Sequence, residues 1–323
     1  MSRTVVQIDE QGGPEVLNVR ELPSPDLGPG QLLVAVHAAG INFIDTYHRS
    51  GLYEMPLPLI PGSEGSGTIT ALGDGVDDFA VGDAVAWVGG AGSYASEVAI
   101  PASVALAVPA SMSLSAAAAL PLQGMTAHYL IDSVYPLGPG DRCLIHAAAG
   151  GTGRLLVQMA KLRGAEVVAT VGSDEKAELA RSAGADHVIN YRTTDIVEGV
   201  EAAVGKDAID VVYDGVGAST FEAGLAVLRV RGTMATFGNA SGAVPPVSPL
   251  VLMAKSLLLT RPKLWDFTLT TEERDRRWNE IVAWVESGAL DVRIGMEVPL
   301  ADAAEAHRAL ESRQTTGKLL LRP

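Results

Sequence analysis

The hydrophobic positions in the first third of the chain fall in short segments. Between Thr4 and Pro109, apolar runs such as QLLVAVHAAG, GTITALG and DAVAWVG are separated by clusters of Gly, Pro and Asp. Short apolar runs bounded by turn-forming residues are typical of β-strands joined by tight turns. This part of the chain is therefore predicted to form a compact, mostly antiparallel β unit.

The pattern changes in the segment SLSAAAALPLQGMTAHYLIDSV. Ser113 has a side chain suited to an N-cap, an alanine-rich helix follows it, and Pro121 is expected to end or kink that helix. We place a domain boundary near this segment.

From Arg142 onward, apolar strands alternate with amphipathic helices. The strand RCLIHAAA precedes the helix GRLLVQMAKLRG, and the strand EVVATVG precedes the helix SDEKAELARSAG. Continuous apolar strands that alternate with helices indicate a parallel sheet covered on both faces, and hence an α/β fold. The alternation continues through SLLLTRP and gives about six strands. Helices are then predicted around 271–286 and 301–311, and the final apolar GKLLL is expected to return to the first domain.

Composition narrows the classes of function. The 323 residues include 24 Lys and Arg against 38 Asp and Glu, a net charge of −14. A protein that binds a nucleic-acid backbone needs the opposite charge, so no nucleic-acid partner is expected. Cys143 is the only cysteine, the N-terminus has no apolar leader, and no apolar run approaches the roughly 20 residues of a membrane span. These features predict a soluble cytoplasmic protein without a membrane partner.

The stretch HAAAGGTG, which follows the strand RCLI, is the first candidate for chemistry. Ala148, Gly150 and Gly153 occupy the three positions of the dinucleotide fingerprint G-x-G-x-x-G, with Ala in place of the first glycine. Gly150 would let the backbone approach a pyrophosphate, Gly153 would let the helix pack on the strand, and the helix N-terminus would supply N–H groups. The alternative is a tight strand-to-helix corner that binds no ligand.

The end of the next strand bears on the choice between NAD and NADP. An acidic residue at this point usually binds a free ribose, but this strand ends in Gly172 and Ser173. Ser173 is predicted to cap the next helix, with two acidic residues on its first turn. Lys176 and Tyr191 could reach a 2′-phosphate, so the sequence favours NADPH. The alternative for Lys176 is an exposed helix lysine.

Seven blocks of sequence, taken in order, resemble those of one superfamily. They are AAGINFIDTYHRSGLY, PGSEGSGTI, VGDAVAW, PLQGMTAHYL, the segment from HAAAGGTG to HVINYR, VVYDGVGASTF and FGNASGAVPPV. Over essentially its whole length the chain resembles the medium-chain dehydrogenase/reductase superfamily and, within it, the zinc-free NADPH:quinone oxidoreductases related to zeta-crystallin.

The resemblance implies a fold, a cofactor and an assembly. It implies a GroES-like, mostly-β catalytic domain formed by residues 1–122 and 264–323, and a Rossmann NADPH-binding domain with a doubly wound parallel sheet formed by residues 123–263. A cleft would hold the nicotinamide. The family usually forms homodimers through its Rossmann sheets, and the strand GTMATFG, late in the predicted sheet, could lie near the sheet edge that takes part.

The resemblance also implies cofactor contacts at matching positions. They are Gly150, Gly151, Thr152 and Gly153 for the pyrophosphate, Gly172, Ser173, Lys176 and Tyr191 for the adenosine phosphate, Phe237, Gly238, Asn239 and Thr126 near the nicotinamide, and Arg313 as a late arginine that reaches back to the cofactor. Thr152 stands where relatives commonly carry Val, a difference expected to be silent.

The resemblance further implies that catalytic zinc is absent. Zinc-dependent relatives place a Cys and a His where this chain has Asn42 and Ser63. An amide and a hydroxyl are poor zinc ligands, and the six histidines are scattered without metal-ligand spacing. Without a Lewis acid to ionise an alcohol, alcohol oxidation is disfavoured and no metal is expected.

Hydride transfer to an electrophilic quinone or enone needs positioning more than strong acid or base catalysis. A hydrogen-bond donor would stabilise the oxygen that gains charge, and Asn42, Tyr47 and Tyr53 are the candidate catalytic residues. Their alternative roles are structural, because Asn42 would orient backbone at a strand end and the tyrosines would be half-buried packing residues. Asp45 is expected to hold its loop.

The leading hypothesis is an NADPH-dependent quinone reductase acting on a small molecule without a metal. The sequence does not separate it from an NADPH-dependent alkenal or enone reductase. A non-catalytic NADPH-binding protein of the crystallin type is the alternative from a different class.

Overall fold

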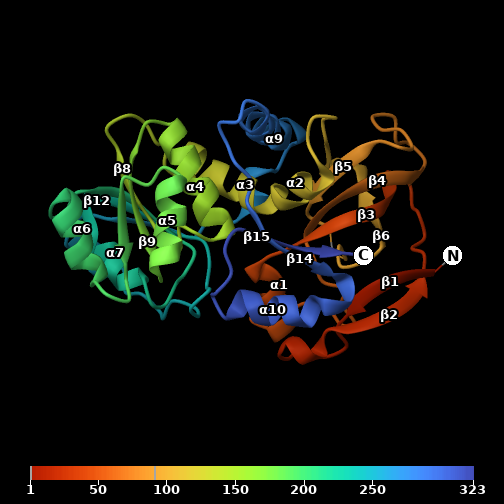
Figure 1. The fold of residues 1–323 in the computed structure, drawn as a ribbon, viewed down its shortest axis with the longest axis horizontal. Coiled ribbons are helices and arrows are strands. Elements are labelled where there is room, and N and C mark those ends of the chain that lie inside the picture. The colour runs from red at the N-terminus through yellow and green to blue at the C-terminus, as the bar shows by residue number, and fades with distance from the viewer. Residues whose placement is uncertain (1, 91) are drawn as a thin grey trace. The chain divides into compact units, whose positions relative to one another are not determined.

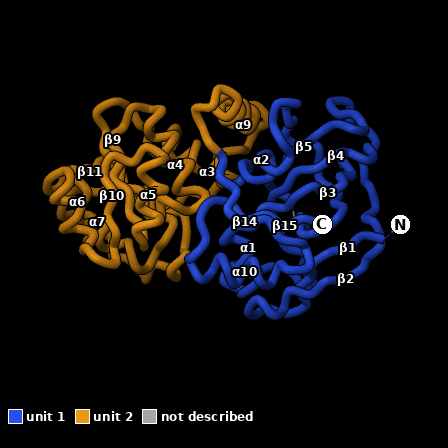
Figure 2. The backbone as a smooth tube through the Cα atoms, in the orientation of Figure 1, with its two compact units in different colours: residues 1–122, 292–323 blue, residues 123–291 orange. Residues whose placement is uncertain are grey.

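The computed structural model describes residues 2–90 and 92–323. The chain divides into two compact units, which Figure 2 shows in different colours. Unit 1 consists of residues 1–122 and 292–323, and unit 2 consists of residues 123–291. The chain therefore leaves unit 1, forms the whole of unit 2, and returns to complete unit 1.

Unit 1 is mostly β structure, as the short apolar segments predicted (Figure 1). Its elements are β1 (Ser2–Gln7), β2 (Asn18–Pro23), β3 (Gln31–Ile41), α1 (Phe43–Ser50), β4 (Glu64–Leu72), β5 (Ala84–Val88), β6 (Glu97–Pro101), β7 (Ala105–Ala107), α2 (Leu114–Ala119), β14 (Ile294–Pro299), α10 (Ala303–Glu311) and β15 (Lys318–Arg322). A seven-stranded sheet runs in the order β14-β15-β3-β4-β5-β7, with β6 also paired to β3. Its pairs are antiparallel apart from β14 with β15, which confirms the predicted antiparallel character.

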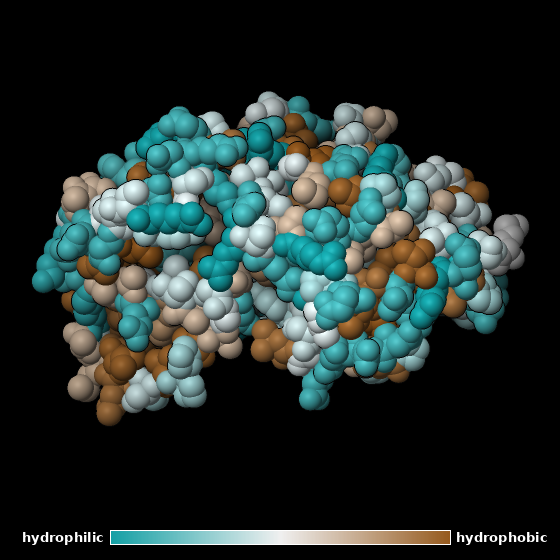
Figure 3. All heavy atoms as spheres, turned by 60° about the horizontal axis from the view of Figure 1, so that its bottom comes forward, coloured by the Kyte–Doolittle hydropathy of each residue, from teal (hydrophilic) through white to brown (hydrophobic). Residues whose placement is uncertain are grey.

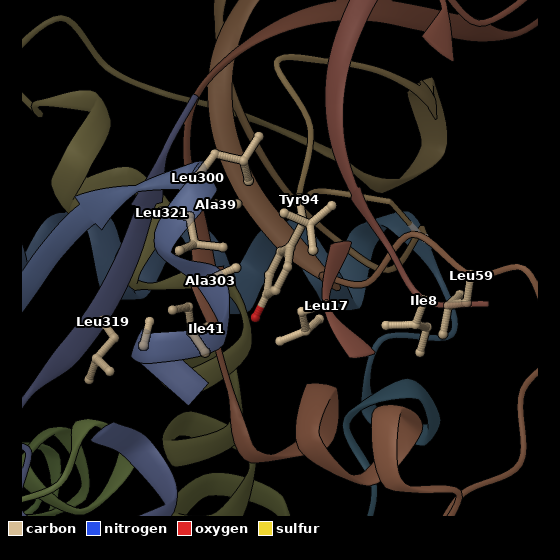
Figure 4. Packing of buried hydrophobic residues seen from close by; sticks show 12 residues of the cluster. Ile8, Leu17, Ala39, Ile41, Leu59, Tyr94, Leu300, Ala303, Leu319 and Leu321 are labelled. Atoms are coloured by element: carbon tan, nitrogen blue, oxygen red, sulfur yellow. The ribbon is translucent and has the colours of Figure 1, made fainter. Parts of the chain in front are cut away.

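The core of unit 1 joins the two ends of the chain. Ile41 at the end of β3 and Leu321 on β15 are buried in one cluster with Leu300 and Ala303, around the ring of Tyr94 (Figure 4). Burying such side chains stabilises the fold by about 1.5–3 kcal/mol each. The C-terminal GKLLL segment therefore returns to the first domain, as expected.

Unit 2 is an α/β unit built on a parallel sheet. Its elements are α3 (Pro121–Tyr129), whose first turn begins in unit 1, then β8 (Arg142–Ile145), α4 (Gly151–Leu162), β9 (Glu166–Val171), α5 (Asp174–Ser182), β10 (His187–Asn190), α6 (Ile196–Val204), β11 (Ile209–Asp214), α7 (Phe221–Val227), β12 (Leu228–Thr236), α8 (Leu250–Met253), β13 (Leu258–Thr260) and α9 (Thr271–Glu286). All pairs in the six-stranded sheet, in the order β10-β9-β8-β11-β12-β13, are parallel.

The strand order reverses between β8 and β11, because the chain first builds outward through β9 and β10 and then through β12 and β13. At such a reversal the loops at the carboxyl ends of the strands leave a crevice where ligands bind. The doubly wound sheet predicted from the sequence is thus confirmed, and a ligand site is expected at the carboxyl ends of its strands.

The chain returns to unit 1 later than expected, and this corrects the domain boundary predicted near residue 264. Residues 264–291 belong to unit 2 in the structure. Phe267 stacks on Tyr129 of α3 with 4.5 Å between ring centroids. Arg277 of α9 is fully buried and donates to His128 Nδ1 at 3.1 Å, while His128 Nε2 lies 2.8 Å from Glu280. These contacts hold α9 in unit 2, and nothing in its amphipathic pattern specifies which neighbour it would pack against.

The outer edge of the unit 2 sheet carries exposed apolar side chains. β13 is the edge strand on this side of the sheet, and β12, which carries most of GTMATFG, lies next to it, near the edge as the sequence indicated. Leu258 on β13 is 62% exposed, and Leu250 and Met253 on α8 are 72% and 75% exposed. Figure 3 shows apolar side chains gathered at one end of unit 2.

Within the described part of the chain, no helix has the length and apolar character needed to cross a membrane.

Candidate active site

The glycine corner lies between β8 and α4, at the carboxyl edge of the unit 2 sheet. Gly150 is the N-cap residue of α4, and among the described residues no side chain caps this helix. A Cβ built on Gly153 would lie 2.9 Å from the carbonyl carbon of Ala147 and closer still to its oxygen. Ala148, at the first fingerprint position, is fully buried. Gly153 therefore permits the close packing of helix on strand, and the first turn of α4 presents backbone N–H groups suited to a pyrophosphate.

The predicted adenosine-side residues come together at the ends of β9 and β10. A Cβ on Gly172 would lie 2.9 Å from Tyr191 Cζ, so the tyrosine ring lies directly against this glycine. Ser173 Oγ accepts a hydrogen bond from the backbone N–H of Lys176 at 3.2 Å, which confirms it as the N-cap of α5. Asp174 on the first turn accepts from Asn190 Nδ2 at 2.8 Å. This carboxylate is engaged in holding α5 to β10.

Arg192 is a charged residue near this corner that was not predicted from the sequence. Burial lowers the pKa of Lys176 below its ordinary value, and the nearby guanidinium of Arg192 lowers it further. Two cations held close to one another at the end of a parallel sheet favour a bound anion. Arg192 follows Tyr191 directly, so its position beside a predicted site residue was the available signal.

The remaining predicted cofactor residues lie in three places. Phe237, Gly238 and Asn239 follow β12, where a Cβ on Gly238 would lie 2.9 Å from the carbonyl carbon of Gly215 in the loop after β11. Thr126 is buried in α3. Arg313 follows α10 in unit 1 and has a left-handed backbone with φ of 58°. Its contact with the cofactor stays a prediction, as do the contacts of the other residues.

In unit 1, Asn42 directly follows β3 and is the N-cap residue of α1. Its backbone N–H donates to Asp45 Oδ2 at 2.8 Å, so the Asp45 carboxylate holds the chain where β3 gives way to α1. Its side-chain amide is also engaged, because Nδ2 donates to Glu64 Oε1 at 2.6 Å and Oδ1 accepts from Lys318 Nζ at 2.8 Å. Glu64 and Lys318 are buried residues that the sequence analysis did not identify.

The two candidate tyrosines lie side by side. Their ring centroids are 5.3 Å apart at an interplanar angle of 73°, and the backbone N–H of Tyr53 donates to the Tyr47 carbonyl. Tyr47 is 9% exposed and Tyr53 is 39% exposed. The pair thus combines a packed ring with an accessible one, which suits contact with a flat molecule.

A directed chain of buried hydrogen bonds supports Asp45. Arg49 donates to His307 Nδ1 at 3.0 Å, which leaves the His307 proton on Nε2, 2.9 Å from the Tyr94 hydroxyl. Tyr94 in turn donates to Asp45 Oδ2 at 3.2 Å. Arg49 also pairs with Glu311 at 2.6 Å. The chain of bonds ties α1 to α10, and Asp45, which accepts the Asn42 backbone N–H, holds its loop as expected.

We expect Asp45→Asn to weaken the pH dependence of stability. Burial raises the pKa of Asp45 from 3.8 to about 7, so the folded protein keeps a proton that the unfolded chain releases. The free energy of unfolding due to this group therefore falls as pH rises from about 4 to about 7. The oxygen of the introduced amide would still accept both hydrogen bonds. Urea unfolding at pH 5 and pH 8 should show a smaller loss of stability at pH 8 in the variant.

The His307 side chain opposes this trend in both proteins and therefore cancels from the comparison. Burial and Arg49 lower its pKa to about 3, so its contribution to stability is lost as pH falls from about 6.5 towards 3. An unchanged pH dependence in Asp45→Asn would show that Asp45 is ionised throughout this range.

Comparison with known proteins bears on both units. Residues 28–110 match the family model "Alcohol dehydrogenase GroES-like domain", and residues 151–287 match "Zinc-binding dehydrogenase". Quinone oxidoreductase 1 of Escherichia coli K12 is 43% identical over 99% of both chains. The chain belongs to the quinone oxidoreductase family. The 2-haloacrylate reductase of a Burkholderia species is 39% identical over 98% of both chains.

Solved structures of quinone oxidoreductases agree with this assignment. The Escherichia coli quinone oxidoreductase complexed with NADPH has a TM-score of 0.97 and 42% identity, covering 99% of this chain and all of that one. A mycobacterial protein complexed with NADPH has a TM-score of 0.96 and 46% identity, with the same coverage. The GroES-like and Rossmann-type domains inferred from the sequence are therefore confirmed.

Proposed function

We propose that this protein is an NADPH:quinone oxidoreductase. The observation that supports NADPH as the cofactor is the set of groups at the carboxyl edge of the unit 2 sheet. The helix N-terminus at Gly150 and the cations Lys176 and Arg192 lie there, and β9 does not end in a carboxylate. The relatives named as quinone oxidoreductases support the substrate class.

NADPH supplies the hydride when it is bound. The backbone N–H groups of residues 151–153 bind its pyrophosphate, and Lys176 with Arg192 holds the 2′-phosphate. Asn42 donates a hydrogen bond to the quinone oxygen that gains negative charge, and Tyr47 and Tyr53 pack on the ring and exclude water. Phe237, Gly238, Asn239, Thr126 and Arg313 complete the proposed cofactor contacts.

The proposed reaction needs no metal in unit 1. The groups at the two positions where zinc-dependent relatives carry ligands are the Asn42 amide and the Ser63 hydroxyl, both poor zinc donors. The Lys318 ammonium donates to Asn42 Oδ1, so a cation already lies there. A second positive charge at this position would be repelled.

Rates of NADPH oxidation test the proposal. We expect faster turnover with 1,4-benzoquinones than with 2-alkenals or 2-haloacrylates, measured at matched concentrations from the absorbance of NADPH. Activity confined to the activated alkenes would instead support the alkenal or enone reductase alternative, and one relative is named for the reduction of another activated alkene, 2-haloacrylate. Binding of NADPH without reduction of either class would support the non-catalytic alternative.

We also infer a homodimer joined through β13. Among the described residues, no strand pairs with the outer side of this edge strand, and the exposed Leu250, Met253 and Leu258 would be covered by a second copy. Light scattering after size exclusion should give twice the mass of one chain, and Leu258→Lys should shift the population to monomer. A wild-type monomer at all concentrations would contradict this assembly.

The single, buried Cys143 is consistent with the proposed cytoplasmic location.

A further inference from the structure

Three neighbouring strand ends bring a buried ion pair to the side chain of Asn42. β15 pairs with β3 so that Leu319 faces Ile41, which places Lys318 next to Asn42. β4 pairs with β3 on the other side, with Gly65 facing Ala39, which places Glu64 beside Gly40. A Cβ on Gly40 would lie 2.5 Å from Glu64 Oε1, so this glycine leaves the space that the carboxylate fills.

The contacts of this ion pair fix which way the Asn42 amide faces. Lys318 offers only donors, and Glu64 as a carboxylate offers only acceptors. Lys318 Nζ donates to Asn42 Oδ1 at 2.8 Å, and Asn42 Nδ2 donates to Glu64 Oε1 at 2.6 Å. A rotation of the amide by 180° would point N–H at ammonium and oxygen at carboxylate. The two ions therefore select one orientation, in which the ammonium also polarises the amide.

The two ions contact each other directly and are buried from water. Lys318 donates to Glu64 directly, and Glu64 Oε2 accepts the backbone N–H of Leu122, at the first turn of α3, at 2.7 Å. Lys318 is 2% exposed, Glu64 is 0% exposed and Asn42 is 4% exposed. Because the cost of desolvating two charges usually offsets their attraction, such a pair is a poor means of stabilising a fold. What it does supply is a fixed geometry at Asn42.

We propose that Lys318 and Glu64 are positioning residues that orient and polarise the Asn42 amide for hydrogen bonding to the substrate oxygen. The inference rests on the proposed function of Asn42 in quinone reduction. The two ions do not touch the substrate, and their effect passes through the amide.

The test uses the double variant Lys318→Met/Glu64→Gln, because a single replacement would leave one buried charge unpaired and could unfold the protein. We expect the kcat for quinone reduction to fall by at least roughly 10-fold. The loss should not exceed that caused by removing an oxyanion donor outright. The Kd for NADPH, measured by fluorescence, should not change. In an Asn42→Ala background the two replacements should cause no further loss of kcat, because their effect requires the amide.

A matched control separates this role from a general structural one. Lys161→Met/Asp186→Asn removes another lysine ion pair, with Nζ 2.8 Å from the carboxylate, whose other side-chain hydrogen bonds within the described residues go to the backbone of Ala165 and Val167. It should leave kcat unchanged. A folded Lys318→Met/Glu64→Gln protein with wild-type kcat would overturn the proposal, and so would a loss of kcat that adds fully to that of Asn42→Ala.

A readout that does not need turnover distinguishes failure of this inference from failure of the proposed function. With 15N-asparagine labelling, the Asn42 side-chain amide is identified by its loss in Asn42→Ala. Its N–H signals should be shifted and slow to exchange in wild type, and should move towards those of exposed amides in the double variant. Unchanged signals would overturn the inference. If the wild-type protein reduced no quinone and the double variant still lost the shifted Asn42 signals, the positioning role would be supported. Only the quinone reductase proposal would then be contradicted.

Discussion

Replacing Lys176 with alanine should raise the KM for NADPH by roughly 10- to 100-fold and leave the KM for NADH nearly unchanged. A hydrogen bond to a charged group is worth about 1.5–3 kcal/mol, and only NADPH carries the 2′-phosphate that Lys176 would bind. Arg192 lies close enough to lower the pKa of Lys176, so Arg192→Ala should change cofactor preference in the same direction. Steady-state kinetics with both cofactors, at saturating quinone, measures the effect.

Lys206 is the matched control for this experiment. It is an exposed lysine of unit 2 in the turn after α6, and Lys206→Ala should leave both KM values unchanged. An equal rise in the two KM values for Lys176→Ala would mean that the lysine contacts a part of the cofactor that NADH and NADPH share. The 2′-phosphate would then be bound elsewhere.

Gly153→Ala should abolish measurable NADPH binding and destabilise unit 2. Its added Cβ would meet the backbone of Ala147, which a rotamer change does not relieve. Overpacking of this kind costs about 1–3 kcal/mol, and it would displace the first turn of α4 from its position at the end of β8. Fluorescence titration with NADPH and thermal unfolding should both report the change.

Gly150→Ala separates the two roles of the glycine corner. The nearest atom to a Cβ on Gly150 is the Ala147 oxygen at 3.2 Å, and its φ of −76° suits any residue. This variant should unfold near the wild-type temperature and yet bind NADPH more weakly, because the Cβ occupies space near the pyrophosphate. If Gly153→Ala matched wild type in both measurements, α4 would have more freedom to shift than its packing indicates.

The sequence predicted those parts of the site that are formed by contiguous segments. The ends of β8, β9 and β10 each follow an apolar strand, and parallel strands bring their carboxyl ends to one edge, so the glycine corner, Gly172 and Tyr191 were predictable as one region. The cap at Ser173 followed from residue type alone.

The parts that were missed depend on contacts between distant segments. Lys318 and Glu64 are 254 positions apart, and only the register of β15 and β4 on either side of β3 brings them to Asn42. Similarly, the amphipathic pattern of α9 shows that it has a buried face, whereas its partners at His128 and Tyr129 are specified only by the tertiary structure. The number of strands was predictable, and so was the position of β12 near one edge of the sheet.

The return of the chain to unit 1 has a consequence for biosynthesis. Unit 2 is one continuous segment whose strands all precede residue 261, so it can fold while the end of the chain is still in the ribosome. The sheet of unit 1 lacks β15 until residues 318–322 emerge, because this strand lies between β14 and β3. The cofactor-binding unit can therefore form during translation, whereas the proposed substrate-binding unit is completed only after the last codons are read.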